Sequence, residues 1–571
     1  MQVRNTFILN GGNNYMSDIV RIFALGGLDE NGKNMYVVEI NDDIFVLEAG
    51  MKYPESTMPG IDIIIPDYTY LIKNKDRVKG YIITHGHDDC MGSVTYACKD
   101  VPAPIYCSKV TSEMIKDTAR RYRQNVKLDF RIVDTTSDVK INGRTFKFFS
   151  TTHSVAQSMG VAISTSQGYI VYTGDYIIDC GAFKKFRTDL KALARIAENK
   201  ILCLMTESVA SNTPDYASPN HKLTPLVKRQ FEEFEGRVVV ALYNQNLFGL
   251  QEMINLGIKN NKKIVIFSKD MEQLMTNMGV EGLLDIPERN RGTLEDLKKE
   301  DQSDVLVIIT SHGERLFRIL ERIANEEMED TGLLLGENDL IIMAAPSVPG
   351  VEVIAVNVLD LLYRTGAKIV NISSKKISSM HAQEEDIKTI ISMLQPAFYI
   401  PVKGYYKDLI SNATLANSMQ IGLNHNNIFV MDNGMVAKFV DNKYVAGEEM
   451  IQTGELMVDG LGIFDAGSVV INDRNKLADD GVIILGVTID SKTKEIVAGP
   501  DVQTRGLVFI KESEHLVKDI ASLYIEVVNS AFSNPKLDIN EKRTVIREKV
   551  SKYVKKETGK DPMVLSMVVE I

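Results

Sequence analysis

The sequence is poor in cysteine and contains no long apolar run. Its cysteines are scattered and include no CxxC pair: Cys90, Cys98, Cys107, Cys180 and Cys203. This spacing argues against a disulfide framework and fits a reducing compartment. No segment approaches the roughly 20 apolar residues that span a bilayer, and the N-terminus is too polar for a signal peptide. We therefore expect a cytoplasmic protein without a membrane segment.

An excess of basic residues is also absent, because the net charge is −11. This charge argues against a surface coated with basic residues, although a local basic groove could still bind nucleic acid. Hydrophobic residues make up 44% and charged residues 25% of the 571 residues, as in ordinary soluble globular proteins. A chain of this length is expected to form about three or four domains.

The hydrophobic pattern changes along the chain. Residues 18–225 contain many short β-branched strands separated by turns, which predicts hairpins in a sandwich of sheets. In residues 226–380, strand-like and helical runs alternate, as in a parallel α/β domain. Residues 464–480 are polar and linker-like. Residues 481–571 show a strand, two helices and a last strand, which predicts a small α+β module.

Metal-binding residue types gather in T-H-G-H-D-D-C-M-G, residues 84–92, directly after the apolar segment Tyr81–Ile83. Imidazoles two residues apart on a turn can point at one ion, and a following aspartate can reach a second. His85, His87 and Asp89 have this spacing. The alternative is a polar loop with incidental histidines, but the chain has only 8 histidines. The sequence therefore predicts a metal site.

Two later strand ends carry further ligand types. His153 ends the strand of F-S-T-T-H-S, and Asp175 ends that of Y-T-G-D-Y. Each residue alone is more often a cap or a satisfied turn residue. Together they supply a third imidazole and a carboxylate that can bridge two ions, as in two-metal hydrolases.

These motifs resemble those of the metallo-β-lactamase superfamily and, within it, the β-CASP nucleases. The sequence is most similar to the ribonuclease J family, on E-A-G-M-K-Y-P-E, T-S-H-G-E, S-S-M-H-A-Q-E-E, I-P-V-K-G and A-G-P-D-V-Q-T-R-G. The resemblance covers residues 18–571. It implies an α/β fold in which a metallo-β-lactamase αββα sandwich is interrupted by a parallel α/β β-CASP domain and followed by a small α+β C-terminal domain.

The resemblance also implies domain boundaries. We expect an N-terminal extension at 1–15, the metallo-β-lactamase domain at 16–221 and 381–463, the β-CASP domain at 222–380, a linker at 464–480 and the C-terminal domain at 481–571.

The activity implied by the resemblance is a metal-dependent ribonuclease of the cytoplasm. Such an enzyme degrades single-stranded RNA from a 5′-monophosphate end, also cuts internally, and takes part in mRNA decay and rRNA maturation. The implied partners are a homodimer copy or an active ribonuclease J paralogue in a hetero-oligomer, together with RNA degradation machinery. The implied cofactor is a divalent metal, manganese or zinc, with magnesium as a further alternative.

Site residues are carried over position by position. The first metal site would use His85, His87 and His153, with Asp175 bridging, and Asp89 would belong to the second. Catalytic roles fall to Asp89, Asp175 and His381. The implied substrate-binding residues are Ile377, Ser378, Ser379, Met380, His381, Ser311, His312 and Glu207. Of these, Ser311, His312 and Ser379 would supply donors to a 5′-phosphate.

The sequence departs from the family at the second metal site. Cys90 and Lys403 stand where the family has histidine ligands, and Glu48 replaces an aspartate. An ammonium has donors only and cannot coordinate a cation, although Lys403 could place a positive charge where the second ion would sit. A Cys90 thiolate would suit zinc better than manganese or magnesium. We therefore expect one ion rather than two.

These departures look like those of the divergent second paralogue of the family. The leading expectation is a ribonuclease of low activity. The alternative is a catalytically inactive RNA-binding and structural subunit of a complex with an active paralogue.

Two surfaces are weaker candidates for contacts. Basic residues occur at Lys116, Arg120, Arg121 and Arg123, and at Lys184, Lys185 and Arg187, where a solvated face is the ordinary interpretation. The terminal P-M-V-L-S-M-V-V-E-I could leave a strand edge for pairing.

Overall fold

The structure is a computed structural model that describes residues 17–55, 58–278, 282–299, 301–348, 350–460, 462–465, 469–507 and 514–571. The extension expected at residues 1–15 lies outside this range. Two compact units are present: one contains residues 1–53 and 62–463, and the other contains residues 54–61 and 464–571. No helix in the described part of the chain is long and apolar enough to cross a bilayer.

Two sheets pack face to face in the larger unit. The strands of the first sheet, in sheet order, are β20 (Lys443–Val445), β19 (Ala437–Val440), β1 (Val20–Gly26), β2 (Met35–Ile40), β3 (Asp43–Leu47), β5 (Val78–Ile82), β6 (Ile105–Cys107) and β7 (Phe130–Ile132). Those of the second sheet are β18 (Phe398–Val402), β12 (Ile201–Glu207), β11 (Gly168–Tyr172), β10 (Met159–Thr165), β9 (Arg144–Ser150) and β8 (Val139–Ile141). Apolar side chains of both sheets, such as Phe45 and Phe146, share one buried cluster.

Helices cover the outer faces of both sheets. Those on the first sheet are α1 (Thr69–Lys73), α3 (Val94–Asp100) and α4 (Lys109–Arg121), and those on the second are α5 (Leu190–Ala197), α11 (Glu384–Leu394) and α12 (Tyr406–Ser418). Alternate strand residues face these helices: Val46 packs with the first group and Leu204 with the second. This alternation follows the two-residue period of a strand, and the predicted αββα sandwich is confirmed.

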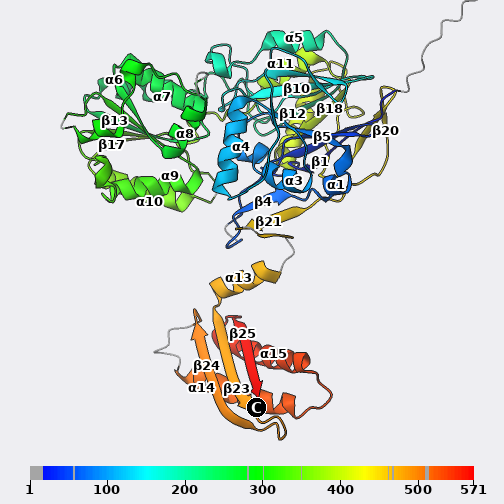
Figure 1. The fold of residues 1–571 in the computed structure, drawn as a ribbon, viewed down its shortest axis with the longest axis vertical. Coiled ribbons are helices and arrows are strands. Elements are labelled where there is room, and N and C mark those ends of the chain that lie inside the picture. The colour runs from blue at the N-terminus through cyan, green and yellow to red at the C-terminus, as the bar shows by residue number, and fades with distance from the viewer. Residues whose placement is uncertain are drawn as a thin grey trace, which may run out of the picture. The chain divides into compact units, whose positions relative to one another are not determined.

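The insertion between β12 and β18 contains a parallel sheet (green in Figure 1). Its strands, in sheet order, are β14 (Lys263–Phe267), β15 (Val305–Ser311), β13 (Arg237–Tyr243), β16 (Asp339–Met343) and β17 (Lys368–Asn371). One face packs on α6 (Thr224–Glu233) and α7 (Leu247–Lys259), and the other on α9 (Gly313–Ala324) and α10 (Glu352–Arg364). The alternation of strands and helices thus gives the expected parallel α/β domain.

The smaller unit contains a sheet with the order β24 (Ile496–Arg505), β23 (Val482–Ile489) and β25 (Met563–Glu570). The helices α14 (Glu514–Phe532) and α15 (Ile539–Thr558) cover one face of it. The prediction missed β24, because Gly499 and Pro500 interrupt its apolar pattern. The segment expected to be a linker at 464–480 contains the helix α13 (Val469–Asp479).

The remaining elements are short. They are α2 (Asp88–Met91), α8 (Lys269–Met278), β4 (Ile63–Pro66), β21 (Glu455–Asp459), β22 (Gly462–Asp465) and the 3₁₀ turns Lys75–Arg77, Lys184–Phe186, Glu288–Asn290, Leu294–Lys298 and Glu329–Thr331.

Candidate metal centre

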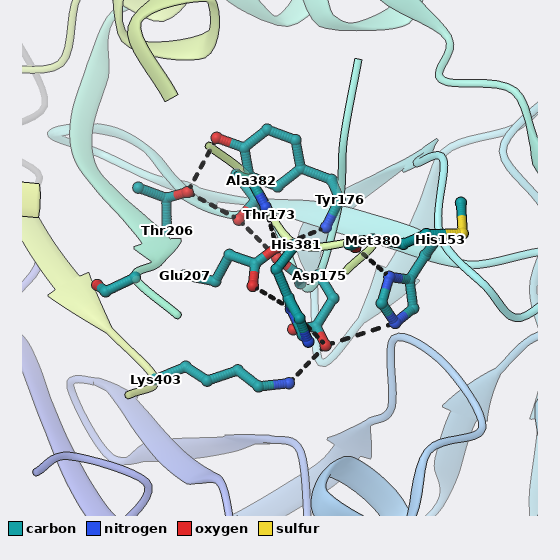
Figure 2. A network of polar contacts seen from close by, with 12 residues as sticks. His153, Thr173, Asp175, Tyr176, Thr206, Glu207, Met380, His381, Ala382 and Lys403 are labelled. Carbon is teal, nitrogen blue, oxygen red and sulfur yellow. Dashed lines mark hydrogen bonds and ion pairs between the residues drawn. The ribbon is translucent and has the colours of Figure 1, made fainter. Parts of the chain in front are cut away.

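The sheet order brings distant parts of the chain to one edge of the sandwich. The strands β18, β12 and β11 are parallel neighbours, and their carboxyl ends lead to Lys403, Glu207 and Asp175. Figure 2 shows these side chains around the Asp175 carboxylate, with His153 opposite Lys403. The facing sheet contributes the loop that joins β5 to α2 and carries His85.

His85, His87, His153 and Asp175 form the first half of the site. Their potential ligand atoms all lie within 4.8 Å of one another. Asp175 Oδ2 lies 3.4 Å from His85 Nε2 and 3.6 Å from His153 Nε2. The motif spacing had predicted this set, and the structure brings all of it together.

The ring nitrogen of each histidine that points out of this cluster has a hydrogen-bonding partner. His85 Nδ1 lies 2.9 Å from Thr84 Oγ1, and His153 Nδ1 lies 2.7 Å from the carbonyl oxygen of Met380. His87 Nε2 lies 3.0 Å from Ser154 Oγ. Partners of this kind orient imidazoles that bind metals.

Protonation also favours a cation at this place. Burial, with the neighbouring His85, lowers the pKa of His87 to about 3, and burial lowers the pKa of His153 well below its ordinary value. Neutral rings keep a lone pair for a metal. His85 Nε2 and Asp175 Oδ1 are buried without a hydrogen bond among the described residues. Three imidazoles and a carboxylate suit zinc or manganese, so the residues fit the divalent metal that the fold implies.

Lys403 dominates the second half of the site. Its ammonium Nζ lies 2.5 Å from Asp175 Oδ2 and 2.6 Å from Asp89 Oδ2, and the residue is 2% exposed. Burial alone would lower the pKa of Lys403, but Asp175 and Asp89 outweigh it and hold the pKa well above its ordinary value. The Lys403 ammonium therefore supplies one positive charge between the Asp89 and Asp175 carboxylates.

Cys90 lies beside the Lys403 ammonium in this half. Burial, together with the nearby Asp89 carboxylate, raises the pKa of the Cys90 thiol well above its ordinary value. Its Sγ lies 3.9 Å from Lys403 Nζ and 3.8 Å from Asn34 Nδ2. The thiolate ligand considered from the sequence stays a prediction, because a bound ion would itself lower the pKa of the thiol.

Glu207 and His381 form a pair beside Asp175. His381 Nδ1 lies 2.6 Å from Glu207 Oε2 and 3.7 Å from Asp175 Oδ2. Burial alone would lower the pKa of His381, but the Glu207 carboxylate outweighs it and raises the pKa. The His381 imidazole is therefore held by a carboxylate and can donate a hydrogen bond to an anion at the site.

Glu48 lies behind His85, at the position of the family's aspartate. It accepts hydrogen bonds from Thr84 Oγ1 at 2.5 Å and from the Thr84 amide at 3.2 Å. Burial raises the pKa of Glu48 to about 7, against the effect of His85. The Glu48 carboxylate thus contacts Thr84, and the Thr84 hydroxyl in turn contacts the His85 ring.

The residues expected to bind substrate are only partly brought together. Ser311 is buried with an unbonded hydroxyl, and His312 Nε2 lies 2.9 Å from Asn244 Nδ2. Ser378 and Ser379 belong to the segment that precedes Met380, with Ile377 half-buried before them. No hydrogen bond among the described residues joins these two groups. The shared phosphate pocket stays a prediction.

Acidic neighbours occupy much of the basic stretch on α4. Lys116 and Arg120 pair with Glu113 and Asp117. Arg121 lies 3.4 Å from Asp88 Oδ2 and 3.6 Å from Asp117 Oδ2. All three residues are thus paired with carboxylates of the protein itself, which favours the ordinary interpretation of a helix face over a dedicated contact for RNA. Lys185 likewise pairs with Asp285.

Sequence reasoning missed the residues that hold the ligands. Asn34 donates to Asp89 Oδ2 at 3.1 Å and to the Asp89 carbonyl at 2.9 Å. Thr84 and Ser154 hold histidines through hydroxyls, and Met380 does so through its backbone. Thr84 directly precedes and Ser154 directly follows a predicted ligand, so their position in the sequence could have identified them. The Met380 contact could not have been found in this way, because every residue has a backbone carbonyl.

Comparisons with known proteins agree with this architecture. Residues 28–194 match the metallo-beta-lactamase superfamily, residues 235–362 match the ribonuclease J beta-CASP domain, and residues 469–571 match the ribonuclease J C-terminal domain. Ribonuclease J 2 of Staphylococcus saprophyticus is 33% identical over 97% of this chain and 98% of its own length. Ribonuclease J 2 of Staphylococcus aureus is 32% identical over the same shares.

A solved structure supports the fold alone. A protein of unknown function from Enterococcus faecalis aligns over 74% of this chain and 100% of its own length, with a TM-score of 0.52 and 15% identity.

Proposed function

Because the chain belongs to the ribonuclease J family of metal-dependent ribonucleases, we propose that it hydrolyses single-stranded RNA slowly, with one divalent ion and one lysine in place of two ions. The substrate carries a 5′-monophosphate and is degraded from that end, with some internal cleavage. The proposed setting is mRNA decay and rRNA maturation in the cytoplasm.

The observation that carries this proposal is the contrast around Asp175. On one side lie the imidazoles of His85, His87 and His153, which can hold an ion. On the other side lies Lys403, whose ammonium is within hydrogen-bonding distance of both Asp175 and Asp89. A second dication at this place would be repelled by a buried ammonium at close range. We therefore assign one ion to the site, manganese or zinc, with magnesium as the alternative.

The chain's own groups account for the rest of the chemistry. A bound divalent ion would activate water and neutralise charge on the phosphate. Lys403 keeps a second positive charge beside Asp175, and unlike a bound ion this charge cannot dissociate into solvent. His381, oriented by Glu207, donates a hydrogen bond toward the scissile phosphate, and Asp89 is held by Asn34 to orient a water. The activity is low because an ammonium cannot bind water or a phosphate oxygen as a metal does.

The test is hydrolysis of 5′-monophosphorylated single-stranded RNA by the purified protein, with manganese, magnesium and zinc supplied separately. We expect metal-dependent release of mononucleotides that is lost in Asp175→Ala. The matched control is Asp134→Ala, which removes an exposed aspartate outside the site. Equal release by wild type and Asp175→Ala in every metal would contradict catalysis at this site.

A second candidate is a structural subunit that binds an active ribonuclease J paralogue or a second copy of the chain. It is favoured by the edge strand β25, where Leu565, Met567 and Val569 are 46%, 58% and 50% exposed. An apolar edge of this kind invites pairing with another chain. The proposed occupant is the C-terminal domain of the partner.

This candidate is tested by mixing the chain with a purified active paralogue and measuring the mass of the complex by light scattering. Met567→Glu should weaken association. Val497→Glu, which charges a similarly exposed residue on the opposite edge strand β24, should leave it unchanged. An association that neither substitution affects would exclude β25 as the contact.

A further inference from the structure

Tyr53 combines an exposed ring with an anchored hydroxyl. The residue is 54% exposed, but its hydroxyl donates a hydrogen bond of 2.7 Å to Asp88 Oδ2. Asp88 is itself buried, and the same oxygen lies 3.4 Å from Nη1 of Arg121. The far end of the ring is therefore held by a carboxylate that the protein also fixes, while much of the ring surface stays in water.

The backbone holds the near end of this side chain. The Met51 amide donates a hydrogen bond of 2.9 Å to the Asp88 carbonyl. The preceding residue, Gly50, passes so close to Asp89 that a Cβ at this position would lie 1.6 Å from the Asp89 carbonyl oxygen. Tyr53 directly follows this packed segment, so the loop that carries it is fixed against the metal-binding motif.

Solvent reaches the site beside Tyr53. The side chain of Asp89, which directly follows Asp88, is 25% exposed, whereas that of Asp175 is 0% exposed. Consecutive Cα atoms lie only about 3.8 Å apart, so the residue that anchors Tyr53 adjoins a residue at the open side of the site. An RNA chain whose phosphate approaches Asp89 from solvent would pass close to the Tyr53 ring.

Exposure alone would not distinguish Tyr53 from an ordinary surface tyrosine. Tyr363 and Tyr406 are exposed to a similar extent, 57% and 51%, but no hydrogen bond of either hydroxyl occurs among the described residues. Ordering either of those rings against a ligand would cost conformational entropy. The Tyr53 ring is already ordered by Asp88, as a preorganised binding surface requires.

On the basis of the ribonuclease activity proposed above, we propose that the Tyr53 ring stacks on an unpaired base of the RNA, at a nucleotide close to the scissile phosphate. Every base has a π-face, so a contact of this kind tolerates any sequence. A base inside a duplex is already stacked and paired, and it is not available to the ring. Tyr53 is thus a substrate-binding residue that favours single-stranded over double-stranded RNA.

Fluorescence anisotropy with labelled 5′-monophosphorylated RNA, in chelator so that no strand is cut, measures the Kd. Tyr53→Ala should weaken binding of single-stranded RNA roughly 10-fold, as expected for the loss of one base stack. Tyr53→Phe retains the ring and should bind within a few-fold of wild type. The matched control is Tyr363→Ala, which removes a similarly exposed tyrosine and should bind normally. Equal affinity of Tyr53→Ala and wild type would overturn the proposal.

A duplex of the same sequence separates base stacking from a general disturbance of the site. Its bases stay paired, so Tyr53→Ala should leave the affinity for the duplex unchanged. An equal loss of affinity for the single strand and for the duplex would assign the effect to a disturbed surface and would overturn the proposal.

Tryptophan fluorescence gives a further readout. The chain contains no tryptophan, so Tyr53→Trp places a single reporter at the proposed contact. Single-stranded RNA should quench the emission of this reporter by stacking, and the same RNA with abasic nucleotides should not. Unchanged emission, under conditions in which anisotropy shows the RNA to be bound, would count against the contact and overturn the proposal.

None of these measurements depends on hydrolysis. A protein that binds RNA with these signatures but does not cut it would overturn the proposed function and keep the Tyr53 contact. Normal hydrolysis together with normal binding by Tyr53→Ala would overturn the Tyr53 contact alone. A wild type that binds no RNA would overturn both.

Discussion

In one half of the site, the side chains of His85, His87 and His153 each point a ring nitrogen inward, and each ring is held from behind by an oxygen atom. In the other half, the space between Asp175 and Asp89 is taken by the ammonium of Lys403. The two halves share Asp175, so one carboxylate faces both a candidate metal site and a fixed charge. A side-chain ammonium thus supplies one of the two positive charges that a divalent ion would bring to the same carboxylates.

The largest effect is expected from damage to the half that can hold an ion. His153→Ala should weaken divalent metal binding by more than about 100-fold, because loss of a ligand costs more than loss of its supporting contact. Titration calorimetry measures this affinity. His425→Ala removes an exposed histidine outside the site and should bind normally. Normal binding by His153→Ala would show that the imidazole cluster is not the metal site.

The next largest effect is expected from removing the lysine of the other half. Lys403→Met leaves two buried carboxylates without their cation, which should cost about 3–5 kcal/mol of unfolding free energy in chelator. Part of this loss should return when manganese is added, because a second ion could then bind. Chemical denaturation with and without metal measures both effects.

Lys388→Met is the matched control for that experiment, because Lys388 pairs with Glu385 on the helix surface. It should change stability by no more than about 1 kcal/mol in either condition. Similar losses of unfolding free energy for the two lysines would mean that the buried ion pairs of Lys403 stabilise the protein no more than a surface pair does.

A third change would make the two halves alike. The double substitution Cys90→His and Lys403→His supplies imidazoles at the two altered ligand positions. We expect bound manganese to rise from one to two ions per chain, measured by elemental analysis after gel filtration, and RNA hydrolysis to rise about 10-fold or more. An unchanged stoichiometry would show that other residues also exclude the second ion.

The smallest effect on stability is expected at the ion pair between Asp18 and Arg144, which lies nearer the surface. Its contribution can be compared with that of the buried ion pairs of Lys403. Burial alone would raise the pKa of Asp18, but hydrogen bonds from Arg144 and Ser166 hold it at about 2. A lowered pKa means that the stabilisation is complete above the unfolded pKa of 3.8 and is lost as pH falls through about 2.

Asp18→Asn should therefore remove about 1 kcal/mol at neutral pH, after allowance for solvent screening, and almost nothing near pH 2. Denaturation at several pH values measures the difference from wild type. A penalty that did not shrink toward low pH would assign the effect to packing and not to charge.

Much of the architecture could be predicted because its signals are local. Alternating apolar residues gave the sheets, and the change of pattern after residue 225 gave the parallel domain. Local signals failed to predict two elements, because the amino-acid composition of both segments is unusual for a strand or a helix. Gly499 and Pro500 concealed β24, and a polar stretch concealed the helix α13.

By itself, the sequence determined the ligand types and the identity of the altered positions. His85 and His87 lie two residues apart, and Cys90 and Lys403 can be read directly from their motifs. Only the tertiary structure decided what these residues do together. Lys403 and Asp175 are 228 residues apart, and Met380 and His153 are 227 apart. Such contacts depend on the order of strands in the sheet and on packing between domains, and short-range sequence patterns do not encode them.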